Sequence, residues 1–171
     1  MLVVMMGLPG CGKSAVAEGI ARAIGAPVFS VDPLEATLIR AGITRVQRSD
    51  YAAYDLAATL ARSQLTLGQS AIVDAVNSIE IVRAWWRDIA AEFSVPRPLI
   101  ECVCSDVDLH RRRVEGRNRN IEGFIYEPSW ADIEARHAEY EACTEDRLVL
   151  DAARPLDHNI REAAEYVLSY R

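Results

Sequence analysis

Near its amino end the chain reads Gly7-Leu8-Pro9-Gly10-Cys11-Gly12-Lys13-Ser14, which matches the pattern G-x-x-x-x-G-K-[ST] of a phosphate-binding loop. The apolar run at residues 2–6 directly before it suits a buried strand, and residues 15–24 directly after it read as a helix. A strand, a glycine-rich loop and a helix in this order are the context in which the pattern binds nucleotides. The sequence therefore predicts a site for a nucleoside triphosphate.

The parts of this loop have separate chemical roles in the expected site. Glycines let backbone N–H groups surround the phosphate oxygens, and the N-terminus of the next helix adds partial positive charge. We expect residues from Gly7 to Ala15 to contact ATP, with Lys13 reaching the β- and γ-phosphates and Ser14 binding Mg²⁺. Cys11 offers its backbone amide, and its thiol is either reactive or merely tolerated in the loop.

Length and charge narrow the classes of protein to which the chain can belong. A chain of 171 residues has room for one domain, residues 1–171, with a core of its own. The net charge of −6 argues against an extended nucleic-acid surface. No apolar run is long enough to span a membrane, and no basic leader precedes the first predicted strand. We therefore expect a cytoplasmic protein, either a monomer or a homodimer.

Five apolar runs alternate with helix-like stretches along the chain. The runs show no alternation of polar and apolar residues, so each is expected to be a strand that helices cover on both faces. This pattern predicts an α/β fold with a parallel sheet. The expected strands lie at residues 2–6, 27–31, 70–74, 98–104 and 147–150. The expected helices begin after the loop and near Asp32, Ser49, Ile79, Asp106, Ser129 and Asp157.

Two aspartates follow predicted strands at the edge of the sheet where the loop is expected. Asp74 closes the run at residues 71–73, and a carboxylate there can hold Mg²⁺ through water. Asp32 follows the run at residues 28–31, where it can take the proton of an attacking hydroxyl group. Each has a structural alternative, because Asp74 can cap the next segment and Asp32 can cap a helix that starts at Pro33.

Arginines gather after the fourth predicted strand, at Arg111, Arg112, Arg113, Arg117 and Arg119. Arg113 and Arg117 are four residues apart and share one face if the helix continues through Gly116. They could then neutralise charge on the phosphates while a segment at about 114–128, rich in glycine, asparagine and charged residues, closes as a lid. The alternative is a solvated basic face that pairs with nearby glutamates.

A second polar group lies between the second and third predicted strands, at Arg40, Arg45, Arg48, Tyr51 and Tyr54. It predicts either a positive, aromatic pocket for an anionic or nucleoside acceptor, or ordinary surface arginines.

The remaining distinctive residues are expected to have structural roles. Trp85 and Trp86 recur with apolar neighbours at helical spacing and are expected to pack against the core. The histidines lack metal-binding spacing, which predicts surface or capping positions for His110, His137 and His158. Buried, reduced thiols are expected for Cys11, Cys102, Cys104 and Cys143.

With these elements the chain resembles the P-loop kinases that share a nucleoside-monophosphate-kinase-like core, in particular the group with chloramphenicol phosphotransferase, zeta-type toxins, gluconate kinase and polynucleotide kinase. The resemblance rests on the loop at residues 7–14, Ser30-Val31-Asp32, Ile72-Val73-Asp74 and Arg113-Val114-Glu115-Gly116-Arg117. It implies a three-layer α/β/α sandwich with five parallel strands in the order 2-3-1-4-5 and a small lid. It also implies that Asp32 is the candidate base, that Arg113 and Arg117 are lid residues at the nucleotide, and that Arg154 lies near adenine.

The expected function is that of a kinase, which transfers the γ-phosphoryl group of ATP to a hydroxyl group of a small molecule or nucleotide with the help of Mg²⁺. The alternative is a nucleotide-dependent switch, or an NTPase other than a kinase, that binds a partner. The sequence has no Asn-Lys-x-Asp stretch, and Asp74 does not begin an Asp-x-x-Gly stretch. Both features count against a GTPase.

Overall fold

The computed structural model describes residues 1–116, 121–122 and 127–170. The strands in these ranges are β1 (Leu2–Met6), β2 (Val28–Ser30), β3 (Ala71–Asp74), β4 (Leu99–Val103) and β5 (Leu148–Asp151). They form one parallel sheet in the order β2-β3-β1-β4-β5. Each predicted strand is confirmed with its ends shifted by about one residue, and the strand order implied by the resemblance is confirmed as well.

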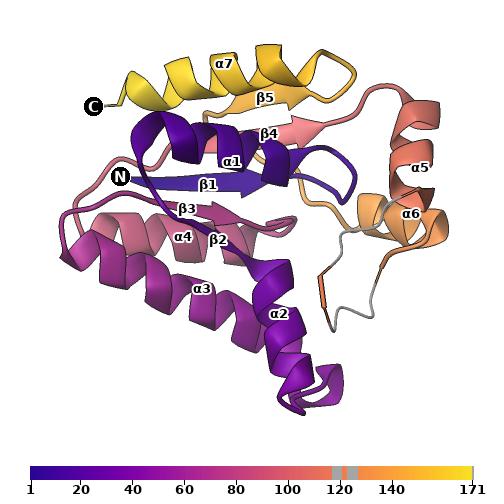
Figure 1. Ribbon diagram of the computed structural model, residues 1–171, viewed down its shortest axis with the longest axis horizontal. Coiled ribbons are helices and arrows are strands. Elements are labelled where there is room, and N and C mark those ends of the chain that lie inside the picture. Colours follow the sequence, from indigo (N-terminus) through magenta and orange to yellow (C-terminus); the bar gives the residue numbers. More distant parts are fainter. Residues whose placement is uncertain (117–120, 123–126, 171) are drawn as a thin grey trace.

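Helices cover both faces of this sheet. They are α1 (Lys13–Ile24), α2 (Val31–Arg40), α3 (Ser49–Thr66), α4 (Glu80–Glu92), α5 (Val107–Glu115), α6 (Trp130–Ala138) and α7 (Leu156–Leu168), with a 3₁₀ turn η1 (Arg45–Gln47). In Figure 1, α1 and α7 lie side by side on one face, and α3 and α4 cover the other. The described chain is thus the expected three-layer sandwich. The pair α5 and α6 lies beyond the carboxyl ends of the strands.

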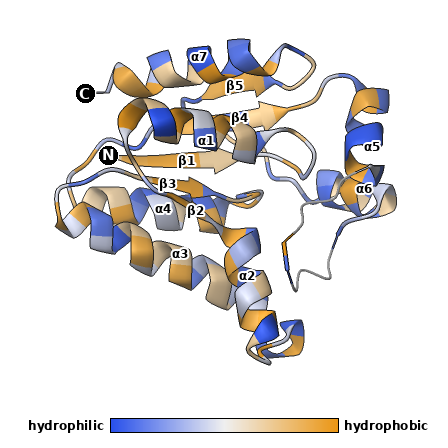
Figure 2. Cartoon of the chain, viewed as in Figure 1, coloured by the Kyte–Doolittle hydropathy of each residue, from blue (hydrophilic) through white to orange (hydrophobic). Residues whose placement is uncertain are grey.

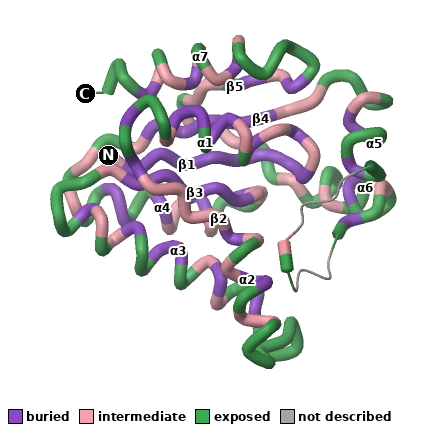
Figure 3. Tube along the Cα trace, in the orientation of Figure 1, coloured by how far each residue is buried: buried purple, intermediate pink, exposed green. Residues whose placement is uncertain are grey.

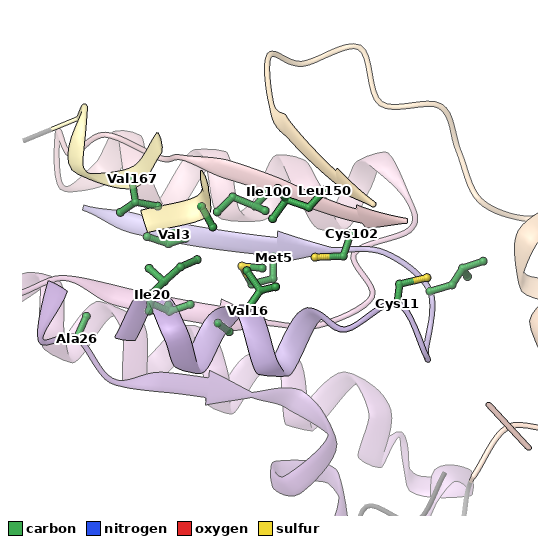
Figure 4. Close-up of a cluster of buried hydrophobic side chains, with 14 of the residues drawn as sticks. Val3, Met5, Cys11, Val16, Ile20, Ala26, Ile100, Cys102, Leu150 and Val167 are labelled. Carbon is green, nitrogen blue, oxygen red and sulfur yellow. The ribbon is translucent and has the colours of Figure 1, made fainter. Parts of the chain in front are cut away.

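β1 explains why the sheet needs a helical layer on each face. Val3 and Met5 belong to the cluster of buried side chains beneath α1 and α7, which Figure 4 shows, whereas Leu2 and Val4 belong to the cluster beneath α3 and α4. All four side chains are fully buried, and Figure 3 shows the strands as the buried centre of the molecule. Because burying one aliphatic side chain contributes about 1.5–3 kcal/mol, an unbroken apolar strand is stable only where both faces are covered.

The helices turn their apolar sides toward the sheet, and Figure 2 shows the mixture of polar and apolar residues along each of them. Trp86 is fully buried and stacks on Trp85 with 5.5 Å between ring centroids, so the tryptophans are packing residues, as predicted. Between α1 and α7 the contact is unusually close: a Cβ atom on Gly19 would lie 2.5 Å from Ile160 Cγ2. The missing side chain at Gly19 therefore allows α7 to rest directly on the helix that follows the loop.

The two helices that carry candidate site residues have ends that bear on the predictions. α2 begins at Val31 with Ser30 as its N-cap residue, so the prediction that Asp32 caps this helix is wrong. The chain turns into the helix as soon as β2 ends, which places Asp32 in the first helical turn. α5 ends at Glu115 and Gly116 is its C-cap residue, so the helix does not continue through Gly116. Arg117 and most of the expected lid at 114–128 lie outside the described residues.

Three further properties of the described ranges concern membrane spans, metal sites and cysteines. No helix there combines the length and the apolar composition that a membrane crossing requires. The same ranges contain no group of three or more histidine, cysteine or acidic side chains arranged to hold a metal ion. All four cysteines are free thiols, of which Cys11 and Cys102 are buried and the other two are half-buried.

Candidate nucleotide and acceptor site

The loop between β1 and α1 has a backbone conformation that requires glycine at defined points. Gly7, Gly10 and Gly12 have φ values of 130°, 88° and 81°. At Gly7 the backbone also approaches β4, where a Cβ atom would lie 2.1 Å from the carbonyl oxygen of Cys102. The first turn of α1 contains no acidic residue, so the partial positive charge at its N-terminus stays available to an anion. The loop therefore has the shape and polarity of a phosphate site.

Lys13 lies within the curve of this loop. Its Nζ donates a hydrogen bond of 3.0 Å to the carbonyl oxygen of Leu8, and the side chain is buried. The cavity at this point is lined by Gly10, Gly12, Lys13, Ser14, Ala15 and Arg113. Arg113 thus reaches the loop from α5, and its Nη1 donates a hydrogen bond of 3.0 Å to the carbonyl oxygen of Ala152. Positive charge from two elements converges on the expected phosphate position.

Asp74 joins the loop to the end of β2. Ser14 Oγ and Ser30 Oγ both donate hydrogen bonds to Asp74 Oδ2, over 2.7 Å and 2.5 Å. The pairing of β3 with β2 places Ser30 opposite Asp74 in the sheet, which explains the second bond. Asp74 is buried, so these hydroxyl groups offset part of the cost of burying its charge. The predicted magnesium residues, Ser14 and Asp74, are therefore in direct contact.

A second cavity beside the loop extends to the segment after β5. Its lining includes Ala15, Arg113, Ala152 and Arg154, and its volume is about 220 Å³. Arg154 thus lies beside the loop, where the resemblance places adenine. Its Nη1 is 3.0 Å from Glu162 Oε2 in α7, so the guanidinium group is held by an ion pair at the edge of this cavity.

A third cavity opens beside the residues that follow β2 and β3 in the sequence. Its volume is about 240 Å³, and it is lined in part by Asp32, Tyr54, Ala75 and Val76. Val31 and Ala75, which directly follow Ser30 and Asp74 in the sequence, also belong to the lining. Asp32 therefore lines a cavity that lies next to the ends of β2 and β3 and can hold a second molecule.

The arginines near η1 do not make this third cavity positive. Of the predicted group, Arg45 and Tyr54 line it, and Arg40, Arg48 and Tyr51 do not. Arg45 is held by Glu35 through two hydrogen bonds, from Nε to Oε1 over 2.8 Å and from Nη2 to Oε2 over 3.1 Å. Burial raises the pKa of Tyr54 to about 12, so its phenol stays protonated at neutral pH.

His110 is a site residue that the sequence reasoning missed. The expected surface or capping role is wrong, because His110 is buried beneath the loop, with Nε2 2.8 Å from the carbonyl oxygen of Pro9. The ring also packs edge-on against Trp130, with 5.3 Å between the ring centroids. A Cβ atom on Gly10 would lie 3.0 Å from the His110 ring, so α5 packs directly on the loop.

The burial of the Cys11 thiol bears on whether it is reactive or merely tolerated in the loop. Burial raises the pKa of Cys11 to about 11, although the positive charge of Lys13 opposes this effect. Figure 4 shows Cys11 and Cys102 at the loop end of the core. A thiol with such a pKa is almost entirely protonated at neutral pH, which favours the alternative that Cys11 is tolerated in the loop rather than reactive.

The fold and the loop geometry define a P-loop nucleotide-binding protein with a kinase-like core. A family model described as an AAA domain matches residues 2–140, and the chain belongs to this family. A search of proteins with curated descriptions gave no sequence match.

Solved structures with the same fold are similar over almost the whole chain. A gluconokinase from Sinorhizobium meliloti 1021 is 20% identical, with a TM-score of 0.72 and coverage of 98% of this chain and 91% of the other. The APS kinase CysC of Mycobacterium tuberculosis, in complex with AMPPNP and APS, is 21% identical, with a TM-score of 0.73 and coverage of 98% and 96%. Kti12 of Chaetomium thermophilum, in complex with ADP-AlF3, is 16% identical, with a TM-score of 0.76 and coverage of 99% and 98%. These likenesses establish the fold.

Proposed function

We propose that the protein is an ATP-dependent kinase that phosphorylates a hydroxyl group of a small molecule. The observation that carries this proposal is the placement of Asp32 in the third cavity, which we call the acceptor cavity and which is lined by Val31 and Ala75, the residues directly after Ser30 and Asp74. A protein that only binds or hydrolyses a nucleotide needs the loop, but it does not need a separate cavity beside the position of the γ-phosphate. The gluconokinase and APS kinase neighbours support the same class of reaction.

In the proposed reaction the hydroxyl oxygen of the acceptor attacks the γ-phosphorus, and Asp32 accepts the proton of that hydroxyl group. The bond between that phosphorus and the β–γ bridging oxygen breaks, and ADP leaves with the bonding electrons. Lys13 and Arg113 neutralise the charge on the transferred group. The products are ADP, a phosphate monoester and one proton.

The residues present also fit a magnesium ion. The hydroxyl group of Ser14 and the carboxylate of Asp74 are hard oxygen ligands, and Asp74 would act through bound water. When bound, the ion would shield the negative charge of the β- and γ-phosphates. If Ser14 turned from Asp74 to the metal ion, Ser30 would keep Asp74 in place, because the hydrogen bond from Ser30 comes from the sheet and not from the loop.

The alternative is an NTPase that binds a partner according to nucleotide state. The likeness to Kti12 in complex with ADP-AlF3 is the observation that favours this alternative. The two functions differ in what stimulates turnover. A kinase releases ADP in proportion to a phosphorylated product, whereas a switch releases ADP and inorganic phosphate.

We place the proposed kinase in the cytoplasm, where ATP is the abundant phosphoryl donor, and assign it no nucleic-acid surface.

An acceptor screen tests the proposal. ADP release with Mg²⁺ and ATP is measured against a panel of hydroxyl compounds, with phosphate transfer followed by ³¹P NMR. We expect Asp32→Asn to lower acceptor-stimulated turnover by about 100-fold or more, because a positioned base contributes about 10²–10⁴-fold. The matched control is Asp55→Asn, which removes an exposed carboxylate from α3.

Nucleotide binding is measured separately by calorimetry. Asp32→Asn should bind ATP as the wild type does, since Asp32 lines the acceptor cavity and not the cavities at the loop. Stimulated turnover that is equal in the wild type and in Asp32→Asn would remove Asp32 from the role of base. Stimulated release of inorganic phosphate without a phosphorylated product would favour the switch.

A further inference from the structure

We propose that the acceptor carries a positive charge, as an amino sugar or another amino alcohol does, and that it is not a phosphate ester or a carboxylate. This inference rests on the proposed kinase function and concerns the cavity that contains Asp32. Its basis is the balance of charges in the cavity lining, together with the hydrogen bonds that already engage one of the two arginines there.

The lining of the acceptor cavity contains more carboxylates than guanidinium groups. Among the described residues, four acidic side chains and two arginines contribute to it, which gives a formal charge of −2. The acids are Asp32, Glu35, Asp50 and Glu139, and the arginines are Arg45 and Arg136. An acceptor that is itself anionic would meet repulsion there, and it would approach the anionic triphosphate as well.

The guanidinium group that could best recognise an anion is already occupied. Arg45 uses Nε and Nη2 to hold both carboxylate oxygens of Glu35. Glu35 is buried and also accepts a hydrogen bond of 3.1 Å from Ser49 Oγ, so this pair is fixed in position. The two-pronged geometry that makes arginine suitable for phosphates and carboxylates is therefore committed within the protein.

Arg136 is the other guanidinium group of the lining, and three carboxylates besides that of Glu35 share the cavity with it. Asp32 contributes a carboxylate from α2, Asp50 from α3, and Glu139 from the end of α6. Asp50 lies 3.4 Å from Arg48 in an exposed pair, which solvent screens strongly. The lining of this part of the cavity, with Asp32, Asp50 and Glu139 against Arg136, therefore has a negative formal charge, which favours a cation.

The size of the cavity limits the acceptor further. Pockets for drug-sized ligands span about 300–1,000 Å³, and this cavity measures about 240 Å³. It therefore suits a molecule no larger than a monosaccharide. Tyr54 and Ile79 supply an aromatic ring and an aliphatic side chain against which a carbon skeleton can lie.

Two sets of acceptors that are similar in size but differ in charge test this inference. The first set is serinol, glycerol and glycerate, and the second is D-glucosamine, D-glucose and D-gluconate. ADP release and phosphate transfer are measured for each compound with Mg²⁺ and ATP. We expect kcat/KM to be at least tenfold higher for the amine of a set than for its neutral and its anionic member.

Variants that change the charge of the cavity lining provide a second test of the charge inference. Glu139→Gln should raise KM for the amine about three- to tenfold with a smaller effect on kcat, and Arg136→Gln should lower that KM. Glu134→Gln is the matched control, because Glu134 is on the same helix but does not line the cavity and instead accepts a hydrogen bond from Trp130 Nε1 over 3.0 Å.

The outcomes separate this inference from the function on which it rests. Preferred phosphorylation of a neutral or anionic member overturns the charge inference and leaves the kinase function standing. ADP release that none of the six compounds stimulates, in a protein that binds ATP normally, counts against both.

Discussion

Gly7 and Cys102 are in such close contact that the first atom of any side chain at residue 7 would overlap the main chain of β4. The Cβ position of Gly7 lies 2.1 Å from the Cys102 carbonyl oxygen, and the φ of Gly7 is 130°. The phosphate loop is therefore built against the sheet at its first residue. Its path depends on a backbone contact that no neighbouring side chain can relax.

This contact predicts a large effect of Gly7→Ala. We expect a loss of about 2–4 kcal/mol in the free energy of unfolding, because the overlap adds to the strain of a positive φ. Gly25→Ala is the control: Gly25 has φ 69° and no atom within 4 Å of its Cβ position, so it should lose about 1 kcal/mol. Urea denaturation of both variants measures the difference, and equal losses would contradict the assigned contact.

The hydrogen bond from Ser30 to Asp74 predicts a link between the sheet and metal-dependent binding. Ser30→Ala should lower the free energy of unfolding by about 1–3 kcal/mol, since a buried carboxylate loses a donor. Nucleotide affinity should fall more in the presence of Mg²⁺ than in EDTA. Calorimetry under both conditions checks this, with Thr66→Ala as a control that removes an exposed hydroxyl from α3. An equal change under both conditions would separate Ser30 from the metal site.

His110 is predicted to position the loop. His110→Ala should destabilise the protein by about 2–3 kcal/mol and weaken ATP binding, because the Pro9 carbonyl loses its partner and a cavity forms under Gly10. His110→Gln offers an amide donor and should recover part of the ATP affinity. His137→Ala, at an exposed position of α6, serves as the control. Loop positioning is refuted if His110→Ala binds ATP with unchanged affinity once folded.

The thiols predict a defined order of modification. Ellman's reagent should react at pH 8 with Cys104 and Cys143, which are half-buried, and reach Cys11 and Cys102 only in urea. Burial raises the pKa of Cys102 to about 12 and that of Cys11 to about 11. Cys104→Ser and Cys143→Ser should each remove one fast-reacting equivalent. Fast labelling of Cys11 in the native protein would contradict its burial.

The raised pKa of Cys11 also predicts a pH dependence of stability. Because the folded protein holds the Cys11 proton more tightly than the unfolded chain, the contribution of the thiol is complete below pH 9 and is lost as the pH rises to 11. The difference in unfolding free energy between the wild type and Cys11→Ala should therefore shrink over this range. Urea denaturation at pH 8, 9 and 10 measures it, and a constant difference would show that Cys11 titrates normally.

Much of the fold could be predicted because its determinants are local. The apolar run that became β1 is continuous, and a continuous apolar strand requires cover on both faces. The loop at residues 7–14 could be predicted because its glycines and its lysine act through a fixed backbone path. Asp74 could be predicted for a related reason, since the carboxyl ends of parallel strands meet at one edge of the sheet.

Other parts of the site depend on how α5 and α6 dock, which no local pattern specifies. His110 reaches the loop only because α5 lies across it, and Arg136 and Glu139 reach the acceptor cavity from α6 and its C-cap. One signal was present: His110 and Val114 are four residues apart, share a helix face, and both approach Gly10. The charge of the acceptor cavity could not be predicted either, because the Arg45 and Glu35 pair forms across a turn.

The seating of Gly19 in α1 against Ile160 in α7 has a consequence for synthesis at the ribosome. α7 is translated long after the helix that organises the phosphate loop, because Gly19 and Ile160 lie far apart in the sequence. Until α7 is released from the exit tunnel, the apolar side of α1 lacks its cover. The ability to capture a nucleotide should thus be acquired abruptly, once α7 has emerged.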